Sequence, residues 1–154
     1  MDELLAVLAR ERDALERLLF RLVETRALLA RADDRFLHLA AHDVETAADA
    51  VRELELFRAI VDPNGDGAPL RSLAAQAEPP LSTIFEDLRL QLGRLAGEIG
   101  AVLEALADLA EDGRSRARGD GNDELDQEIL AAGYEAILNA RERLQLPSLV
   151  ALLG

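Results

Sequence analysis

The sequence predicts an all-α protein: an antiparallel bundle of three long helices with coiled-coil-like packing, a short connecting helix and a C-terminal amphipathic helix. The first observation is a strict alternation of four- and three-residue steps between apolar residues over 81–109. A stripe of this kind, sustained over roughly four heptads, is typical of helices that pack on other helices. Its members are Leu81, Phe85, Leu88, Leu92, Leu95, Ile99, Val102, Leu106 and Leu109. The second observation is two earlier apolar stripes of helical spacing, set apart by two turn signals.

The composition fits one domain with an aliphatic core. The chain has 154 residues and 49% hydrophobic content, which suffices for a core without disulfides or metal. It has no cysteine, which excludes disulfides and thiolate metal sites and favours a cytoplasmic location. Its formal charge of −13 repels phosphate backbones, so nucleic acid is not expected as a partner. No apolar run approaches the roughly 20 residues of a membrane span, so none is expected.

The first two helices are expected to form a hairpin. Asp2 is predicted to cap a helix that runs to about Arg31. Asp33 and Asp34 interrupt the pattern and are predicted to cap a second helix that ends near Val61, before a proline. Its expected apolar stripe is Val44, Ala47, Val51, Leu54 and Phe57. A break here lets the two helices lie antiparallel, whereas the alternative is one continuous rod. The apolar residues of the first stripe include Leu8, Leu15, Leu22 and Leu29.

Two segments contain metal-ligand residue types, but neither pattern predicts a metal site. His38 and His42 stand four residues apart, one turn after Asp34, yet no Glu-x-x-His pair accompanies them. Residues 62–67 match the first half of a calcium loop, but Leu73 occupies the position that requires a bidentate Glu. We therefore expect solvated histidines, a tight connection at 62–67, and no metal or other cofactor.

A short helix and the long helix follow. Residues 70–77 are predicted to form a short amphipathic helix that is stopped by two prolines. The long helix is expected to begin near Pro80, with Thr83 and Glu86 able to form a capping box. Gly113 is the predicted stop of this helix.

Small residues form a second stripe on the long helix, away from the leucines. Gly93, Ala96, Gly97 and Gly100 lie at a spacing that lets another helix approach closely, which makes this face a secondary candidate for partner binding. The alternative is that these glycines are tolerated on an exposed face.

The last part of the chain is predicted to be separate from the bundle. Residues 113–122 are rich in Gly, Ser, Arg and Asp and indicate a flexible linker between a bundle at 1–112 and an amphipathic segment at 123–154. The apolar residues Leu125, Ile129, Ile137 and Leu144 have the spacing of a helix that binds in a groove, and they are the predicted partner-binding residues. The segment either docks on the bundle as a further helix or exchanges onto another protein.

No group of residues indicates catalysis. The carboxylates, Glu11 among them, are expected on solvent-facing sides of helices, and no phosphate loop or nucleophile motif is present. The chemistry of the residues therefore predicts a binding protein and not an enzyme. Two alternatives stay open: a scaffold coiled coil that self-associates through the 81–109 stripe, and a metal-dependent bundle enzyme that uses His38 and His42.

Three segments carry a resemblance to a known family. They are 3–20, with Glu3, Leu4, Leu5, Leu8, Glu11, Leu15, Leu18, Leu19 and Phe20; 53–59, Glu-Leu-Glu-Leu-Phe-Arg-Ala; and 70–74, Leu-Arg-Ser-Leu-Ala. In this order the segments resemble actinobacterial members of the FlgN family of flagellar export chaperones. The resemblance covers about 1–112.

The resemblance implies a cytoplasmic chaperone that binds hook-associated (hook-filament junction) proteins before flagellar type III export. It also implies that the C-terminal amphipathic part binds an amphipathic helix of the cargo, with the export apparatus as a further partner. Such a chaperone has to cover apolar cargo surface while its own acidic surface keeps the complex soluble.

Overall fold

The structure is a computed structural model that describes residues 1–62, 67–119 and 124–154, with side chains at 1–62, 67–117 and 127–154. Its helices are α1 (Asp2–Ala30), α2 (Leu37–Val61), α3 (Leu70–Gln76), α4 (Leu81–Gly119), α5 (Glu124–Arg143) and α6 (Pro147–Leu153). No strand occurs within these described ranges. The prediction of an all-α bundle is confirmed.

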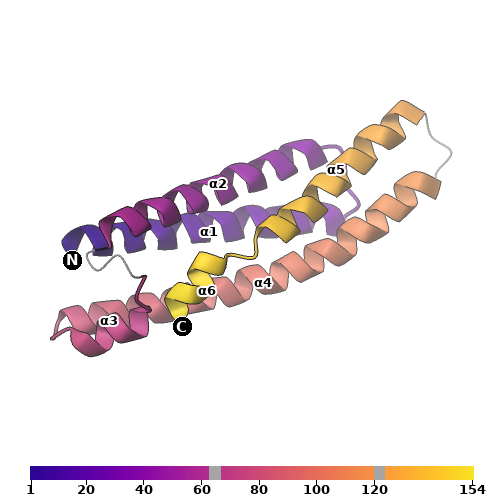
Figure 1. Ribbon diagram of the computed structural model, residues 1–154. Helices are drawn as coiled ribbons and strands as arrows, with labels where there is room; N and C mark the ends of the chain where they lie inside the picture. The colour runs from indigo at the N-terminus through magenta and orange to yellow at the C-terminus, as the bar shows by residue number, and fades with distance from the viewer. Residues whose placement is uncertain (63–66, 120–123) are drawn as a thin grey trace.

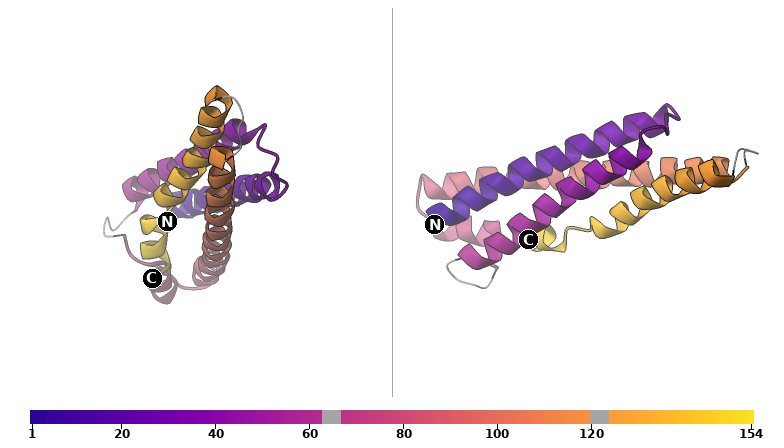
Figure 2. Two further views of the ribbon diagram at one scale, coloured as in Figure 1. Left: turned by 90° about the vertical axis from the view of Figure 1, so that its right-hand side faces the viewer. Right: turned by 90° about the horizontal axis from the view of Figure 1, so that it is seen from above.

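The long helices alternate in direction along the chain. In Figure 1, α1 and α4 run one way, whereas α2 and α5 run the other way. α1 packs on both α2 and α4, and α5 packs on α4 and α2. The short helices α3 and α6 lie together at the end of the bundle that holds the N-terminus, as Figures 1 and 2 show. The predicted single C-terminal amphipathic helix is two helices, α5 and α6, and both are docked on the bundle in this structure.

The leucine stripe of α4 forms the centre of the core, as predicted. Its buried members are Phe85, Leu88, Leu92, Leu95, Ile99, Val102 and Leu106. Leu81 and Leu109, at the two ends of the stripe, are partly buried and pack against the same core. Leu8, Leu15, Leu22 and Leu29 of α1 are buried opposite this stripe. Burying each large apolar side chain stabilises the fold by about 1.5–3 kcal/mol, so these stripes hold the bundle together.

The predicted caps of the first two helices are wrong. Met1 is the N-cap of α1 and Phe36 that of α2, and neither makes a side-chain capping hydrogen bond. Asp2 lies inside the first turn of α1, where its charge still suits the helix dipole. Asp33 instead accepts hydrogen bonds from the guanidinium of Arg35, with Nε at 2.9 Å from Oδ1. The turn itself, between Ala30 and Leu37, is where the sequence predicts it.

The predicted capping box of α4 is also not formed. α4 begins at Leu81, so Thr83 lies within its first turn and not before it. The Glu86 carboxylate accepts a hydrogen bond from Arg89 Nε at 3.0 Å. This pair lowers the pKa of Glu86, because the side-chain hydrogen bond favours the ionised form.

Gly113 does not end α4, which continues to Gly119. The first seven residues of the predicted linker are therefore helical, and its residues 120–122 lie outside the described part of the chain. A Cβ at position 113 would overlap the ring of Tyr134 on α5. Gly113 therefore serves the close approach of α5 and not a helix stop. One core contains buried residues from both sides of the predicted linker, so a separation of 1–112 from 123–154 is not observed.

Candidate functional site

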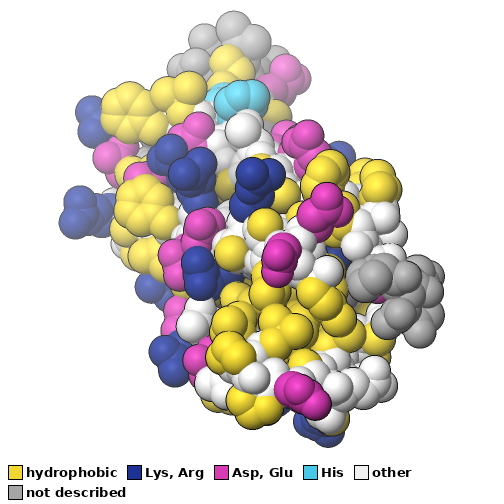
Figure 3. Space-filling view, turned by 90° about the vertical axis from the view of Figure 1, so that its left-hand side faces the viewer, with side chains coloured by type: hydrophobic (Ala, Val, Ile, Leu, Met, Phe, Trp, Pro, Cys, Tyr) yellow, Lys and Arg dark blue, Asp and Glu magenta, His cyan; other side chains and the backbone are white. Residues whose placement is uncertain are grey.

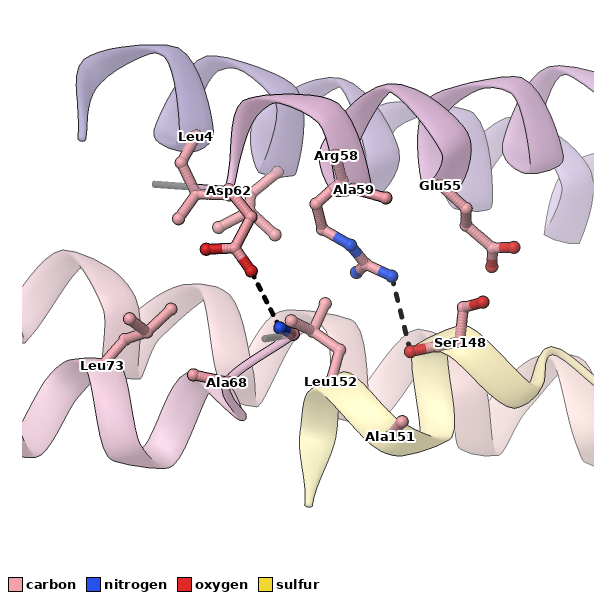
Figure 4. Close-up of a pocket in the computed structure, with 12 residues that line it drawn as sticks. Leu4, Glu55, Arg58, Ala59, Asp62, Ala68, Leu73, Ser148, Ala151 and Leu152 are labelled. Atoms are coloured by element: carbon pink, nitrogen blue, oxygen red, sulfur yellow. Dashed lines mark hydrogen bonds between the residues drawn. The ribbon is translucent and has the colours of Figure 1, made fainter. Parts of the chain in front are cut away.

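A cleft of about 340 Å³ opens at the end of the bundle where α1 begins and α2 ends. In Figure 4, the last turns of α2 form one side, while α3, the segment before it and α6 form the other. We call it the end cleft. Its lining residues are mostly small or apolar: Leu4, Leu8, Glu55, Arg58, Ala59, Asp62, Gly67, Ala68, Leu73, Ser148, Ala151 and Leu152.

Two local features hold the walls of the end cleft in position. The Asp62 carboxylate accepts a hydrogen bond from the backbone N–H of Gly67 at 3.0 Å, which ties the end of α2 to the segment before α3 (Figure 4). Leu146 has a φ of 47°, and Pro147 follows it as the first residue of α6. A left-handed residue followed by proline turns the chain out of α5 and starts a new helix. The buried side chains of Leu149 and Leu152 then hold α6 against the bundle.

A buried ion pair lies beneath the cleft. Arg58 Nη1 is 3.2 Å from Glu11 Oε2, and both side chains are almost fully buried. Burial raises the pKa of Glu11 to about 7, although the positive charge of Arg58 opposes this shift. Glu55 adds to the shift by like-charge repulsion. The other guanidinium nitrogen of Arg58, Nη2, donates to the backbone oxygen of Ser148 at 3.4 Å, so Arg58 connects α1, α2 and α6.

Glu55 is the polar group of the cleft that lacks a full set of partners. It extends from α2 toward α6 in Figure 4. Its Oε1 atom is buried and accepts no hydrogen bond from any residue that the structure describes. Burial raises the pKa of Glu55, while Arg58 and then Arg52 lower it. An unsatisfied buried acceptor costs about 1–3 kcal/mol, so a donor that reached Glu55 would be favoured.

Large apolar side chains are also exposed on the outer surface of α2, near its C-terminal end. Leu56, Phe57 and Ile60 are 70%, 46% and 78% exposed, and we call these three residues the α2 rim. Leu56 and Ile60 follow directly on Ala59 around the helix at 100° per residue, and Ala59 lines the cleft. Figure 3 shows hydrophobic side chains gathered on this end of the molecule. The end cleft and the α2 rim are thus two apolar features at the same end of α2, one inside the bundle and one on its outer surface.

The structure places the predicted partner-binding residues differently from the sequence-based expectation. Ile137 and Leu144 are buried in the core, because α5 packs its apolar face on α4 and α2. Ile129 is 45% exposed, and the side chain of Leu125 lies outside the described residues. The predicted set is therefore not one accessible surface in this structure.

The small-residue face of α4 is exposed. Gly93, Gly97 and Gly100 have no heavy atom within 4 Å of where a Cβ would lie, so no helix approaches them closely. Ala96 and Gly100 border a shallow depression of about 180 Å³ beside the connection between α5 and α6. This arrangement agrees with the alternative that the glycines are tolerated on an exposed face.

The metal-ligand residue types are not gathered in the part of the chain that can be described. His38 and His42 are exposed on α2. Within the described residues no group of three or more His, Cys, Asp or Glu side chains converges. In the 62–67 segment, residues 63–66 lie outside the description.

Sequence reasoning missed Glu11, Arg58 and Glu55 as a group. Glu11 was expected to be solvated, but it is buried because it falls on the same helical stripe as Leu4, Leu8 and Leu15. The sequence did contain one signal of a buried charge: Glu11 occupies a position of the stripe where an apolar residue is expected. The partner could not be found in the same way, since Arg58 lies 47 residues away on another helix.

Comparison with known proteins adds no identification: no family model, curated protein or solved structure matches this chain. In the helices that the structure describes, none combines the length and apolarity needed to cross a membrane.

Proposed function

We propose that this chain is a cytoplasmic chaperone that covers an amphipathic helix of a hook-associated protein before flagellar type III export. The observation that supports the proposal most is an apolar cleft with exposed apolar side chains near it on α2. Leu56 and Ile60 stand one turn apart near Ala59, which lines the cleft, and Phe57 lies farther around the helix. An amphipathic helix in an apolar groove is a recurrent mode of recognition. The resemblance of 1–112 to FlgN-family chaperones agrees with this reading.

The charge of the chain supports the same role. A formal charge of −13 would keep a complex soluble while its apolar surfaces face each other. Export cargo of this kind aggregates when its terminal apolar faces are exposed, so coverage of these faces is the useful activity. The proposed role needs no catalytic residue, metal or nucleic acid.

The binding surface proposed here differs from the one predicted from sequence. A cargo helix could reach Ile137 and Leu144 only if α5 left the bundle, which would expose a large part of the core. The end cleft and the α2 rim need no such rearrangement. The scaffold alternative is less well supported, because the 81–109 stripe through which such a protein would self-associate lies inside the bundle.

The test is suppression of aggregation. Purified hook-associated protein is diluted from denaturant with or without the full chain, and light scattering is followed. We expect the wild-type chain to suppress scattering and the Leu56→Glu and Ile60→Glu variants to do so much less, since each apolar contact is worth about 1.5–3 kcal/mol.

Leu39→Glu is the matched control, because Leu39 is similarly exposed on the same helix but lies far from the cleft. If the wild-type chain does not suppress aggregation, the proposed function is wrong. If Leu39→Glu weakens suppression as much as Ile60→Glu does, the binding surface is wrong.

A further inference from the structure

We infer that α6 is a pH-sensitive wall of the end cleft, which lifts from the bundle more often as pH rises because lifting lets water reach the charge of Glu11. This behaviour belongs to the chain without a partner and stands apart from the proposed function. Three parts of the molecule meet to produce it: a buried carboxylate on α1, the guanidinium of Arg58 on α2, and the short helix whose Ser148 carbonyl oxygen accepts a hydrogen bond from Arg58.

The first part is the charge of Glu11, which the fold keeps from water. The side chain of Glu11 is 4% exposed, and that of Arg58 is 11% exposed. Removing an ion pair from water costs about as much as the attraction between its charges returns, or more. The raised pKa of Glu11, about 7, has this origin, because desolvation is its largest cause and Arg58 offsets only a part of it. The ionised carboxylate is therefore stabilised by any motion that admits water.

The second part is the set of charges around Glu11. From α2, Arg58 lowers the pKa of Glu11 by attraction, and Glu55 raises it by repulsion. α3 contributes Arg71, whose charge acts on Glu86 of α4. α4 faces this region with the buried apolar side chains of its stripe. The residues of α6 have no titratable side chain, so α6 adds to the burial of the ion pair without adding a charge that favours ionisation.

The third part is α6 itself, a helix of seven residues at the margin of the bundle. It follows Leu146, whose φ of 47° is unfavourable for a residue other than glycine. α6 packs on α4 and α3, and the Ser148 oxygen lies 3.4 Å from Arg58 Nη2, which is long for a hydrogen bond. α5 has its own packing on α4 and α2, so α6 can move while α5 stays in place. Such marginal elements open at a lower free energy than the core does.

Lifting α6 opens the end cleft toward Glu11. In Figure 4, Ser148 and Leu152 of α6 lie across the cleft from α2. Leu8 lines the same cleft and lies one turn before Glu11 on the buried stripe of α1. Removal of the α6 wall therefore brings water to the ion pair while α1, α2 and α4 remain packed.

Proton linkage gives the direction of the effect. With α6 docked, the pKa of Glu11 is about 7, and solvation moves it toward the ordinary value of 4.5. Between these pH values the docked state holds a proton that the lifted state has lost. The contribution of Glu11 to docking is thus complete below pH 4.5 and is lost as pH rises through 7.

The test is hydrogen–deuterium exchange of the full chain at pH 5, 6, 7 and 8. The reporters are the α6 amides of Val150 and Gly154, which donate to carbonyl oxygens of the same segment. The wild type is compared at each pH with Glu11→Gln and with Glu53→Gln, a control at an exposed carboxylate of α2. Because intrinsic exchange changes equally with pH in all chains, the ratio between two chains at one pH reports the lifting of α6.

A second variant without a titrating group, Glu11→Leu combined with Arg58→Leu, replaces the whole ion pair by apolar side chains. Thermal melting at each pH verifies that every variant is folded. We expect the lifted fraction of the wild type, relative to either variant without Glu11, to increase about 10- to 40-fold between pH 5 and 7 and to level off above 7. The upper value is the limit that linkage sets for pKa values of about 7 and 4.5.

Glu53→Gln should follow the wild type at every pH. A ratio between the wild type and the variants without Glu11 that does not change with pH would overturn the inference. So would exchange of the α6 amides no faster than that of the amides around Tyr134, since α6 would then open only when the whole bundle unfolds. Neither result bears on the suppression of aggregation that tests the proposed function.

Discussion

The C-terminal helices pack differently at the two ends of the bundle. At the end that holds the turn between α1 and α2, α5 lies so close to its neighbours that two glycines are needed: Gly113 under the Tyr134 ring, and Gly133, where a Cβ would be 2.9 Å from Leu37 Cδ2. The Tyr134 hydroxyl donates to Asp34 Oδ2 at 3.5 Å. We call this the turn end. At the other end, the short helix α6 replaces α5 and leaves the end cleft open.

On the proposed function, the difference separates a part of the bundle that holds the fold from a part that binds a partner. Close packing at the turn end fixes α5 on the core, because a void or an overlap there costs stability directly. The cleft end instead keeps apolar and charged groups incompletely covered, which lowers stability and, as we propose, leaves a surface for a partner. Changes at the turn end should therefore alter folding, and changes at the α2 rim should alter binding.

The largest effect is expected from removing α5 and α6. A chain of residues 1–113 loses six large buried side chains: Tyr134, Ile137, Leu144, Leu146, Leu149 and Leu152. At about 1.5–3 kcal/mol each, their loss is comparable with a typical total stability of about 5–15 kcal/mol. We expect this chain to lose cooperative thermal unfolding followed by circular dichroism.

A shorter truncation separates the two ends. Removing only 147–154 deletes Leu149 and Leu152 and should lower the free energy of unfolding by about 3–6 kcal/mol while the turn end stays folded. For the longer truncation, to residues 1–113, a Tm equal to that of the full chain would show that α5 is not part of the core.

The next effect is a pH dependence that belongs to the cleft end. The pKa of Glu11 is about 7 in the folded chain against a usual value of 4.5. Between these pH values the folded state holds a proton that the unfolded state has lost, so the contribution of Glu11 to stability is complete below pH 4.5 and is lost as pH rises through 7. This difference in pKa corresponds to about 3 kcal/mol.

The measurement is urea unfolding of the wild type and Glu11→Gln from pH 4.5 to 8. We expect the free energy of unfolding of Glu11→Gln, relative to that of the wild type, to increase by about 3 kcal/mol as pH rises, since Gln does not titrate. The difference in free energy of unfolding between Glu53→Gln and the wild type should stay constant over this pH range. A constant difference between the wild type and Glu11→Gln over this range would mean that Glu11 titrates normally in the folded chain.

The smallest effect distinguishes glycines within α4. Gly113→Ala should destabilise the fold by about 1–3 kcal/mol, because the methyl group overlaps Tyr134 and α5 must shift. Gly97→Ala should stabilise it by about 1 kcal/mol, because the site is open and Ala favours the helix. Chemical denaturation measures both. The same sign for the two variants would contradict the distinction between a packed and an exposed glycine.

Periodicity predicted the parts of the fold that repeat. The 81–109 stripe, the α1–α2 turn and the short helix that ends before two prolines all follow from helical spacing and turn residues. Gly113 was misread because a glycine that ends a helix and a glycine that admits a ring from another helix are identical in sequence. Only the position of Tyr134, 21 residues later, distinguishes them.

The candidate site was less predictable than the fold. Leu56 lies in the 53–59 segment, which was read as a helix end that resembles a family and not as a binding surface. Leu56 and Ile60 are exposed because they lie on the side of α2 away from its buried residues. The end cleft depends on Leu146 and Pro147, which turn the chain from α5 into α6. Glu55 and Arg58 meet Glu11 through tertiary packing. Such contacts between distant segments carry no periodic signal.

Hydrogen–deuterium exchange of the full chain, with and without the terminal helices of a hook-associated protein, tests most directly whether the cleft end is the binding end. We expect bound cargo to protect amides of α2 around the α2 rim and amides of α6, and to leave those around Gly113 and Tyr134 unchanged. Protection along the Gly93–Gly100 face of α4 with no change at the α2 rim would contradict this assignment, as would deprotection of α5 on binding.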